Sequence, residues 1–202
     1  MGGKSSKNFT EYFQVGDNET QTHSKKYIND ILAEEKWYQN DRLNREGDLP
    51  AWIIYYENGN KKEEDWRKNG ILNRDNNLPS QISYDKNGNK KEEKWHRNGV
   101  LNRDNDLPSW ISYYENGNKK REIWYINDKY HRDSKSETGC NLPALIWYYE
   151  NGNKKEEEWW INDKRHRDND FPAWILYYEN GKIEKEEWFQ NGKLKRRIEN
   201  YN

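Results

Sequence analysis

One stretch of about twelve residues occurs five times in this chain, and the repetition restricts what the chain can fold into. Tryptophan marks the units, which start at Trp37, Trp66, Trp95, Trp124, Trp159 and Trp188. The spacing is 29 residues, except for 35 between Trp124 and Trp159, where six residues are inserted. A period of this length is typical of repeat proteins, in which each unit is too small to be stable alone and stacks on its neighbours. The copies read YYENGNKKEEDW (55–66), YDKNGNKKEEKW (84–95), YYENGNKKREIW (113–124), YYENGNKKEEEW (148–159) and YYENGKIEKEEW (177–188).

Each unit carries two turn signals, an Asn-Gly within the motif and an Asn-Gly or Asn-Asp three residues after the tryptophan. Asn-Gly between β-rich segments is a strong signal for a two-residue type I′ hairpin. We therefore predict three short strands per unit, such as AWIIYYE, NKKEEDWRK and ILNRD. A two-residue turn at Asn58-Gly59 would pair Tyr55 with Lys62 and Ile53 with Glu64. The predicted fold is all-β: an elongated solenoid, or open meander, of antiparallel β-hairpins built from about five 29-residue repeats.

Side chains alternate across a strand, so Ile53, Tyr55 and Trp66 are expected on one face. The same residue types recur at these positions and predict a repeated core. The Lys-Lys-Glu-Glu runs between them are interpreted as a solvated face with weak cross-strand charge pairs. The predicted core consists of Trp66, Trp95, Trp124, Trp159, Ile53, Ile82, Ile111, Ile146, Ile175, Tyr55, Tyr84, Tyr113, Tyr148 and Tyr177.

Two further aromatic positions recur on the opposite face. They fit either a second packed layer or a ladder of flat binding sites for sugars or peptides. These possible binding-face aromatics are Trp52, Trp110, Trp174, Tyr56, Tyr114, Tyr149 and Tyr178.

The first seven residues, MGGKSSK, fit the N-myristoylation pattern, with Gly2 as the acceptor, Ser6 at the key position and Lys7 after it. Residues 1–33 have no repeat and are predicted to be a flexible tether, followed by a β-hairpin repeat domain over residues 34–202. A single myristoyl chain gives weak, reversible membrane binding, so attachment would be weak or switchable.

The charges are balanced, with 35 Lys and Arg against 36 Asp and Glu, and they are mixed along the chain. No basic stripe is therefore predicted for nucleic acid. The one cysteine fits a reducing compartment, and the apolar runs are too short for a membrane span or a signal segment. We expect a protein that is not secreted, that lies in the cytoplasm or another reducing compartment, and that is associated with a membrane or a virion if Gly2 is myristoylated.

The HRD at 131–133 resembles part of a kinase catalytic loop, but it recurs at 166–168 and as NRD at 73–75 and 102–104. It is therefore a repeat position, interpreted as an Arg-Asp contact at a strand end. The four histidines and Cys140 lack the partners of a metal or nucleophile site. We expect no catalytic residue, metal, cofactor or small-molecule substrate.

The segments WRKNGILNRDNNLP, WHRNGVLNRDNDLP and WINDKRHRDNDFPAWILYYENG resemble MORN-like repeat proteins of large DNA viruses of amoebae and of phages. YYENGKIEKEEWFQNGKL at 177–194 is similar to the MORN variant of bacterial antitoxin-type proteins. The resemblance covers about residues 36–197 and implies a β-hairpin solenoid without a catalytic site.

The leading hypothesis is a non-enzymatic scaffold that is tethered through Gly2 and presents repeated surfaces to a protein partner. The first alternative is an aromatic-ladder module that binds carbohydrates or peptides. The second alternative is an immunity or antitoxin-like protein.

Overall fold

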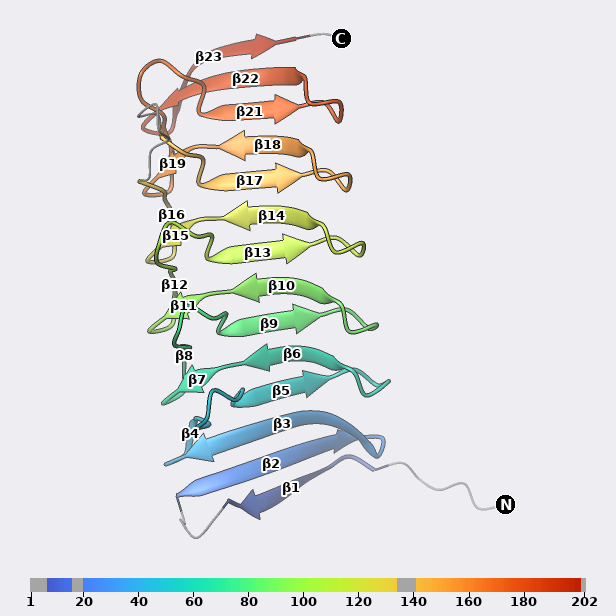
Figure 1. Ribbon diagram of the computed structural model, residues 1–202. Coiled ribbons are helices and arrows are strands. Elements are labelled where there is room, and N and C mark those ends of the chain that lie inside the picture. Colours follow the sequence, from blue (N-terminus) through green and yellow to red (C-terminus); the bar gives the residue numbers. More distant parts are fainter. Residues whose placement is uncertain (1–6, 16–19, 134–140, 201–202) are drawn as a thin grey trace, which may run out of the picture. The chain divides into compact units, whose positions relative to one another are not determined.

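The computed structural model describes residues 7–15, 20–133 and 141–200, and every regular element in these ranges is a β-strand. The chain divides into two compact units, unit 1 (Met1–Gly99) and unit 2 (Val100–Asn202). In each unit, consecutive strands pair antiparallel in an open meander of hairpins, which confirms the predicted fold class (Figure 1). The described residues contain no helix long and apolar enough to cross a membrane.

The sheet of unit 1 follows chain order as β1-β2-β3-β5-β6-β9-β10, and β4 pairs with β3. A separate small hairpin, β7–β8, follows β6. The strands are β1 (Phe9–Gln14), β2 (Gln21–Ile28), β3 (Ile31–Gln39), β4 (Arg42–Leu43), β5 (Trp52–Tyr55), β6 (Lys61–Asp65), β7 (Arg67–Lys68), β8 (Ile71–Leu72), β9 (Gln81–Tyr84), β10 (Lys90–Lys94) and β11 (His96–Arg97).

The sheet of unit 2 has the order β13-β14-β17-β18-β21-β22-β23, with small hairpins β15–β16 and β19–β20 beside it. The strands are β12 (Val100–Leu101), β13 (Trp110–Tyr113), β14 (Lys119–Ile123), β15 (Tyr125–Ile126), β16 (Lys129–Tyr130), β17 (Leu145–Tyr148), β18 (Lys154–Glu158), β19 (Trp160–Ile161), β20 (Lys164–Arg165), β21 (Trp174–Tyr177), β22 (Ile183–Gln190) and β23 (Lys193–Glu199). Cys140 lies outside the described residues.

A repeat consists of two hairpins, and the prediction of three strands in one meander was wrong. In unit 1 the tryptophan lies between β6 in the main sheet and β7 in the small hairpin. The Trp66 N–H donates to the Ser80 carbonyl of the next repeat at 2.8 Å, and the Trp66 carbonyl accepts from the Asn73 N–H at 3.0 Å. These two bonds divide the backbone groups of Trp66 between the sheet and the small hairpin, so the chain turns out of the sheet there.

The two turn signals fold differently. The turns after the tryptophans have positive φ at both central residues, as at Asn69 (50°) and Gly70 (85°), which confirms type I′ turns. In the main hairpin only Gly59 has positive φ, and its N–H donates to the Tyr56 carbonyl. That geometry is a type I turn followed by a left-handed glycine with a bulge. The predicted two-residue turn at Asn58-Gly59 was therefore wrong.

The bulge changes one of the two predicted residue pairs. Ile53 pairs with Glu64 as expected, but Tyr55 pairs with Lys61 rather than Lys62. The recurring isoleucines and tryptophans are 4–8% exposed, and the recurring tyrosines are half-buried. The residue after each proline is also fully buried, a position that the sequence interpretation missed although only alanine or serine occurs there. These small residues are Ala51, Ser80, Ser109, Ala144 and Ala173.

The flexible tether predicted for residues 1–33 was wrong for most of that range. β1 and β2 are strands that extend the sheet beyond β3. Phe9 stacks on Tyr27 with ring centroids 4.6 Å apart, and His23 stacks on Trp37 at 4.2 Å. These aromatic pairs continue the face that carries Ile53 in the repeats. Residues 1–6, which include Gly2 and Ser6, lie outside the described residues.

Candidate functional site

The recurring polar side chains lie where one repeat meets the next, and the contact of each tryptophan shows the pattern. The Trp66 Nε1 donates to the Asp48 carbonyl, 18 residues earlier, at 3.0 Å. Asp48 has a positive φ of 56°, which turns its carbonyl towards the ring. The equivalent bonds, at 2.8–2.9 Å, join Trp95 to Asn77, Trp124 to Asp106, Trp159 to Asn141 and Trp188 to Asp170.

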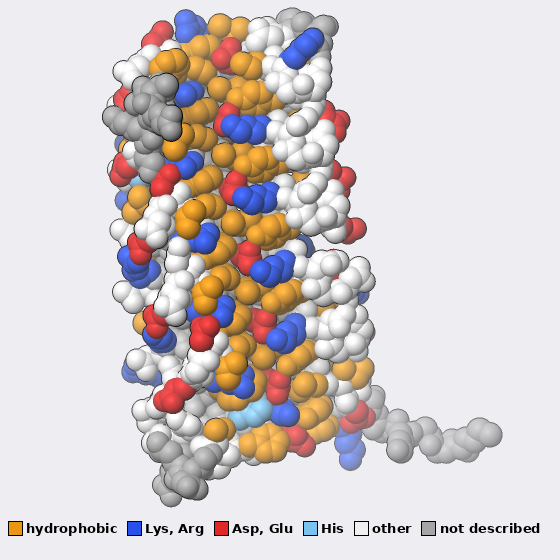
Figure 2. Space-filling view, in the orientation of Figure 1, with side chains coloured by type: hydrophobic (Ala, Val, Ile, Leu, Met, Phe, Trp, Pro, Cys, Tyr) orange, Lys and Arg blue, Asp and Glu red, His pale blue; other side chains and the backbone are white. Residues whose placement is uncertain are grey.

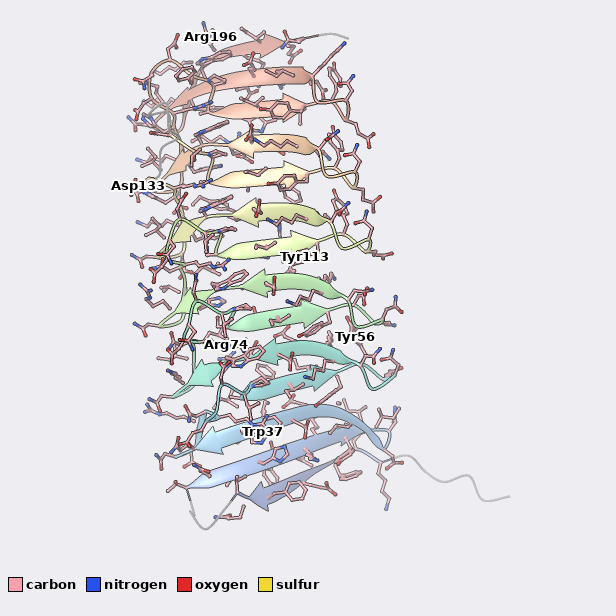
Figure 3. All side chains as sticks on the ribbon, in the orientation of Figure 1. Trp37, Tyr56, Arg74, Tyr113, Asp133 and Arg196 are labelled. Atoms are coloured by element: carbon pink, nitrogen blue, oxygen red, sulfur yellow. The ribbon has the colours of Figure 1, made fainter. Side chains whose placement is uncertain are left out.

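An arginine covers each of these rings in the positions where the contact is described. The Arg74 guanidinium lies 3.8 Å from the Trp66 ring centroid and donates to the Pro79 carbonyl at 3.2 Å. It also binds both carboxylate oxygens of Asp48, at 2.7 and 2.8 Å. This hydrogen-bonded arginine lowers the pKa of Asp48. The arginine of the HRD/NRD position thus stabilises the loop of the preceding repeat (Figure 3).

The HRD motif of unit 2 has the same structural role. Arg132 lies 4.0 Å from the Trp124 ring and binds Asp106 at 2.6 and 2.8 Å. His131 contacts the Asn162 side chain of the next repeat at 3.1 Å, and its other ring nitrogen lies 2.6 Å from Asp133. These contacts account for the motif without a catalytic loop.

A second network joins a tyrosine, a buried glutamate and a lysine. Glu64 is 6% exposed, accepts from the Tyr84 hydroxyl at 2.6 Å and binds the Lys61 Nζ at 2.5 Å. Burial, and then the hydrogen bond to Glu64, raise the pKa of Tyr84. In unit 2, Tyr148–Glu122–Lys119 and Tyr177–Glu157–Lys154 repeat the arrangement at 2.6 Å per contact.

The interpretation of the Lys-Lys-Glu-Glu runs as a solvated face was therefore wrong for the second glutamate. Its pairing opposite an isoleucine places it on the core face, where a tyrosine hydroxyl of the next repeat reaches it. The lysine three residues before it remains half-exposed, with 49% of the Lys61 side chain accessible. Figure 2 shows the resulting surface in each unit, with hydrophobic side chains interrupted by pairs of basic and acidic groups.

The tyrosines predicted as binding-face aromatics use their hydroxyls within the protein. Tyr56 donates to the Tyr84 carbonyl of the next repeat at 2.9 Å. Tyr114 and Tyr149 donate to the carbonyls of Tyr148 and Tyr177, each at 2.7 Å, and Tyr178 donates to that of Asn200 at 3.0 Å. These hydroxyls thus form hydrogen bonds that connect segments of the chain.

The predicted binding-face tryptophans are half-buried, and cationic side chains lie over them. The Lys36 Nζ is 4.8 Å from the Trp52 ring, and the Arg121 guanidinium is 4.0 Å from the Trp110 ring. The Lys185 Nζ is 5.2 Å from Trp174. Stacking of a flat ligand would have to displace these cations, whose attraction to the rings is itself favourable.

Unit 1 also contains a surface cleft of about 520 Å³ beside the loop that precedes β5. Arg45, Asp48, Trp66 and Arg74 are among its lining residues. The charged Arg74 and Asp48 side chains in this lining pair with each other at 2.7 Å. Within the described ranges, no group of three or more His, Cys, Asp or Glu side chains could hold a metal ion.

Comparison with known families gives matches in unit 2. Residues 109–127, 145–159 and 173–187 match the model of the MORN repeat variant. Each segment includes residues of a main-sheet hairpin, so the match coincides with the observed structural unit. No curated protein and no solved structure matches the chain significantly. The chain therefore carries MORN repeat variants at three positions, and MORN repeat proteins are generally non-catalytic scaffolds.

Proposed function

We propose that this protein is a non-enzymatic repeat scaffold, attached to a membrane through an N-myristoylated Gly2, that presents repeated surfaces to a protein partner. The proposal rests on the observation that the recurring polar groups bond one repeat to the next. The indole N–H, guanidinium, phenol and carboxylate of the repeat form joints between successive repeats. Side chains that hold a scaffold together in this way are unavailable for acid–base or nucleophilic chemistry.

The surface that remains for a partner is regular. A half-exposed lysine recurs at one position in four repeats, as Lys61 and Lys90 in unit 1 and Lys119 and Lys154 in unit 2. Their side chains are 49–53% exposed, and each is oriented by a buried glutamate at 2.5–2.6 Å. An ordered lysine loses less conformational entropy on binding than a free one. This regularity suits a partner with evenly spaced acidic or polar groups.

The membrane attachment is supported by the motif and by the way its end joins unit 1. The Lys7 carbonyl accepts from the Asp30 N–H at 3.1 Å, and Asn8 Oδ1 accepts from the Asn29 N–H at 2.9 Å. Only residues 3–6 separate the acceptor Gly2 from Lys7, the first anchored residue. The five steps from the Gly2 Cα to the Lys7 Cα span at most about 17 Å, so acylation would hold unit 1 close to the bilayer surface.

The test is the intact mass of the full chain made in eukaryotic cells, beside a Gly2→Ala control. We expect loss of Met1 and the added mass of one C14 acyl chain, absent from the control. The acylated protein should float with vesicles, and Gly2→Ala should not. A free or acetylated N-terminus in cells that acylate a control substrate would remove the membrane part of the proposal.

The scaffold part has a separate test, set by the aromatic-ladder alternative. We expect no tight glycan binding, because cations and internal hydrogen bonds occupy the predicted binding-face aromatics. Tight glycan binding that is lost in Trp110→Ala would replace the scaffold by a carbohydrate-binding module.

A further inference from the structure

Among the described strands, β1 of unit 1 and β23 of unit 2 stand at the ends of the main-sheet order, and each pairs with one neighbour only. Their side chains are exposed along their whole length. Phe9 and Ile198 are 41% and 40% exposed, whereas Ile53, which has strands on both sides, is 5% exposed. Each of these edges therefore presents both apolar side chains and unpaired backbone groups, which are a template for pairing with another chain.

The two edges differ in charge. β23 reads KLKRRIE, with four cations and one anion, and β1 reads FTEYFQ, with Glu11 as its one charge. Two β23 strands would repel each other, because like charges on neighbouring strands are destabilising. β1 lacks such protection, and its one charge is opposite in sign to that of β23. The charges favour pairing of β1 with β23.

The backbone of β1 has the right groups on its free side. The Val15 N–H donates to the Gln21 carbonyl of β2 at 3.0 Å. In an antiparallel ladder, alternate residues direct their backbone groups to the same side. Odd-numbered residues of β1 therefore bond to β2, and the N–H and carbonyl of Thr10 point to the free edge.

The same reasoning locates the free groups of β23. The Asn200 N–H donates to the Glu184 carbonyl at 2.7 Å, so Ile198 and Arg196 direct their backbone groups towards β22. Arg197 directs its backbone groups to the free edge. A pairing of Thr10 with Arg197 thus brings two sets of unpaired groups together and places Glu11 opposite Arg196 and Phe9 opposite Ile198.

We propose that a second copy of this chain binds end to end, with its β1 adding antiparallel to β23 in this register. The joint consists of three pairs: Glu11 with Arg196, Thr10 with Arg197, and Phe9 with Ile198. The chain uses three pairs at its internal joints as well, as between β6 and β9. A bulge at Lys195 ends the regular ladder of β23 on one side, just as bulges limit the internal joints.

The contact joins different surfaces of the two copies, so it leaves a free β1 and a free β23 in every complex. Such heterologous contacts grow into open chains unless they close into a ring. The inference goes beyond the proposed function and does not depend on acylation. If both hold, each assembly carries several acyl chains, which supplies the second membrane signal that one myristoyl group needs.

The test is sedimentation velocity of the full chain made in bacteria, where no acyl chain is added, over a wide range of concentration. We expect association that continues beyond dimers. Glu11→Arg alone and Arg196→Glu alone should each weaken it about tenfold, because a cross-strand attraction becomes a repulsion. Arg196 also lies 3.8 Å from the centroid of the Trp188 ring, so circular dichroism is needed to verify that Arg196→Glu folds. An equimolar mixture of the two variants should associate again, because every contact between unlike copies pairs Arg with Glu.

A backbone variant checks the joint without changing charge. Thr10→Pro removes an N–H that points away from β2, so β1 should stay folded while association is lost. Gln14→Pro is the matched control, since Gln14 lies in the same strand but outside the three pairs, and this variant should associate normally. Circular dichroism confirms folding of both. A wild-type chain that stays monomeric, or dimers that Arg196→Glu leaves unchanged, would overturn the proposal, the latter in favour of β1 pairing with itself.

Discussion

Asp65 of unit 1 and Ile123 of unit 2 occupy the same repeat position, one residue before the tryptophan, and each is 1% exposed. Asp65 is surrounded by polar groups. It accepts from the Arg67 guanidinium at 2.8 and 3.2 Å and from the Gln81 amide at 3.0 Å. A buried carboxylate in unit 1 is thus satisfied by charge-assisted hydrogen bonds.

Ile123 has apolar neighbours at the same place. It forms a cluster with Tyr125 and Leu145, against which Trp110 and Trp147 pack. Tyr125 stands where Arg67 stands in unit 1, and Leu145 where Gln81 stands. The register is nevertheless unchanged, because Asp65 pairs with Trp52 and Ile123 with Trp110.

The comparison teaches that the backbone of the repeat does not depend on how this position is filled. The turns and the tryptophan contacts set the register, and the side chains at this position are then satisfied by neighbours in the same repeat and in the next one. The next repeat of unit 2 uses the polar solution again, with the Glu158 carboxylate 2.7 Å from Arg165. Burial raises the pKa of Glu158, so this solution has a desolvation cost that the apolar cluster avoids.

The largest expected effect comes from placing the acidic residue of unit 1 in the apolar cluster of unit 2 without a compensating cation. Ile123→Asp would bury a carboxylate beside Tyr125, which cannot neutralise it, and should cost about 4 kcal/mol of unfolding free energy. Denaturant unfolding measures the loss, and hydrogen exchange locates it in unit 2. Adding Tyr125→Arg should recover at least half of it. A loss below about 1 kcal/mol would show that the position does not require local compensation.

In unit 1 the converse experiment is Arg67→Ala. It leaves Asp65 buried with the Gln81 amide but without its cation, and should cost about 3 kcal/mol. Lys68→Ala is the matched control, because Lys68 and its partner Asp75 are 53% and 66% exposed. That pair should contribute less than about 1 kcal/mol. Equal losses for the two variants would contradict a special role of the buried pair.

The sequence predicted the repeat length, the hairpin meander and the type I′ turns, because these depend on local residue types that recur. It could not predict that the side chain immediately before the tryptophan is largely buried. Asp65, Lys94, Ile123, Glu158 and Glu187 differ in chemistry, and only contacts with other strands show that such different residues are all largely shielded.

Two other errors have equally physical causes. Asn58-Gly59 has the composition of a type I′ turn, but a three-residue loop with a bulge uses the same glycine. β1 and β2 lack the repeat motif and are stabilised instead by pairing with β3 and by aromatic stacking, as in His23 on Trp37. The membrane anchor and the binding role of the aromatics remain predictions, since a local sequence motif does not identify a binding partner.

Alkaline pH should sharpen the comparison. Burial first, and then hydrogen bonding, raise the pKa of Tyr84 in unit 1 and of Tyr125, Tyr148 and Tyr177 in unit 2 above the usual 10.0. A raised folded-state pKa means that the stabilisation is complete below pH 10 and is lost as the pH rises further. Each tyrosine should then lose up to about 1.4 kcal/mol per pH unit. Hydrogen exchange at increasing pH measures this, and Tyr125→Phe should flatten the decline in unit 2 alone.

The smallest effect tests what the two units share. Tyr56→Phe in unit 1 and Tyr149→Phe in unit 2 each delete one hydrogen bond to a backbone carbonyl of the next repeat, at 2.9 and 2.7 Å. Both tyrosines are only half-buried, and we expect each loss to be about 1 kcal/mol. Thermal unfolding of the two variants provides the measurement. In both units the tyrosine hydroxyl donates to a backbone carbonyl of the next repeat. The two losses should therefore agree, although the neighbouring side chains differ. A clear difference would mean that the apolar filling of unit 2 tightens the joint between its repeats, and that register and packing are coupled after all.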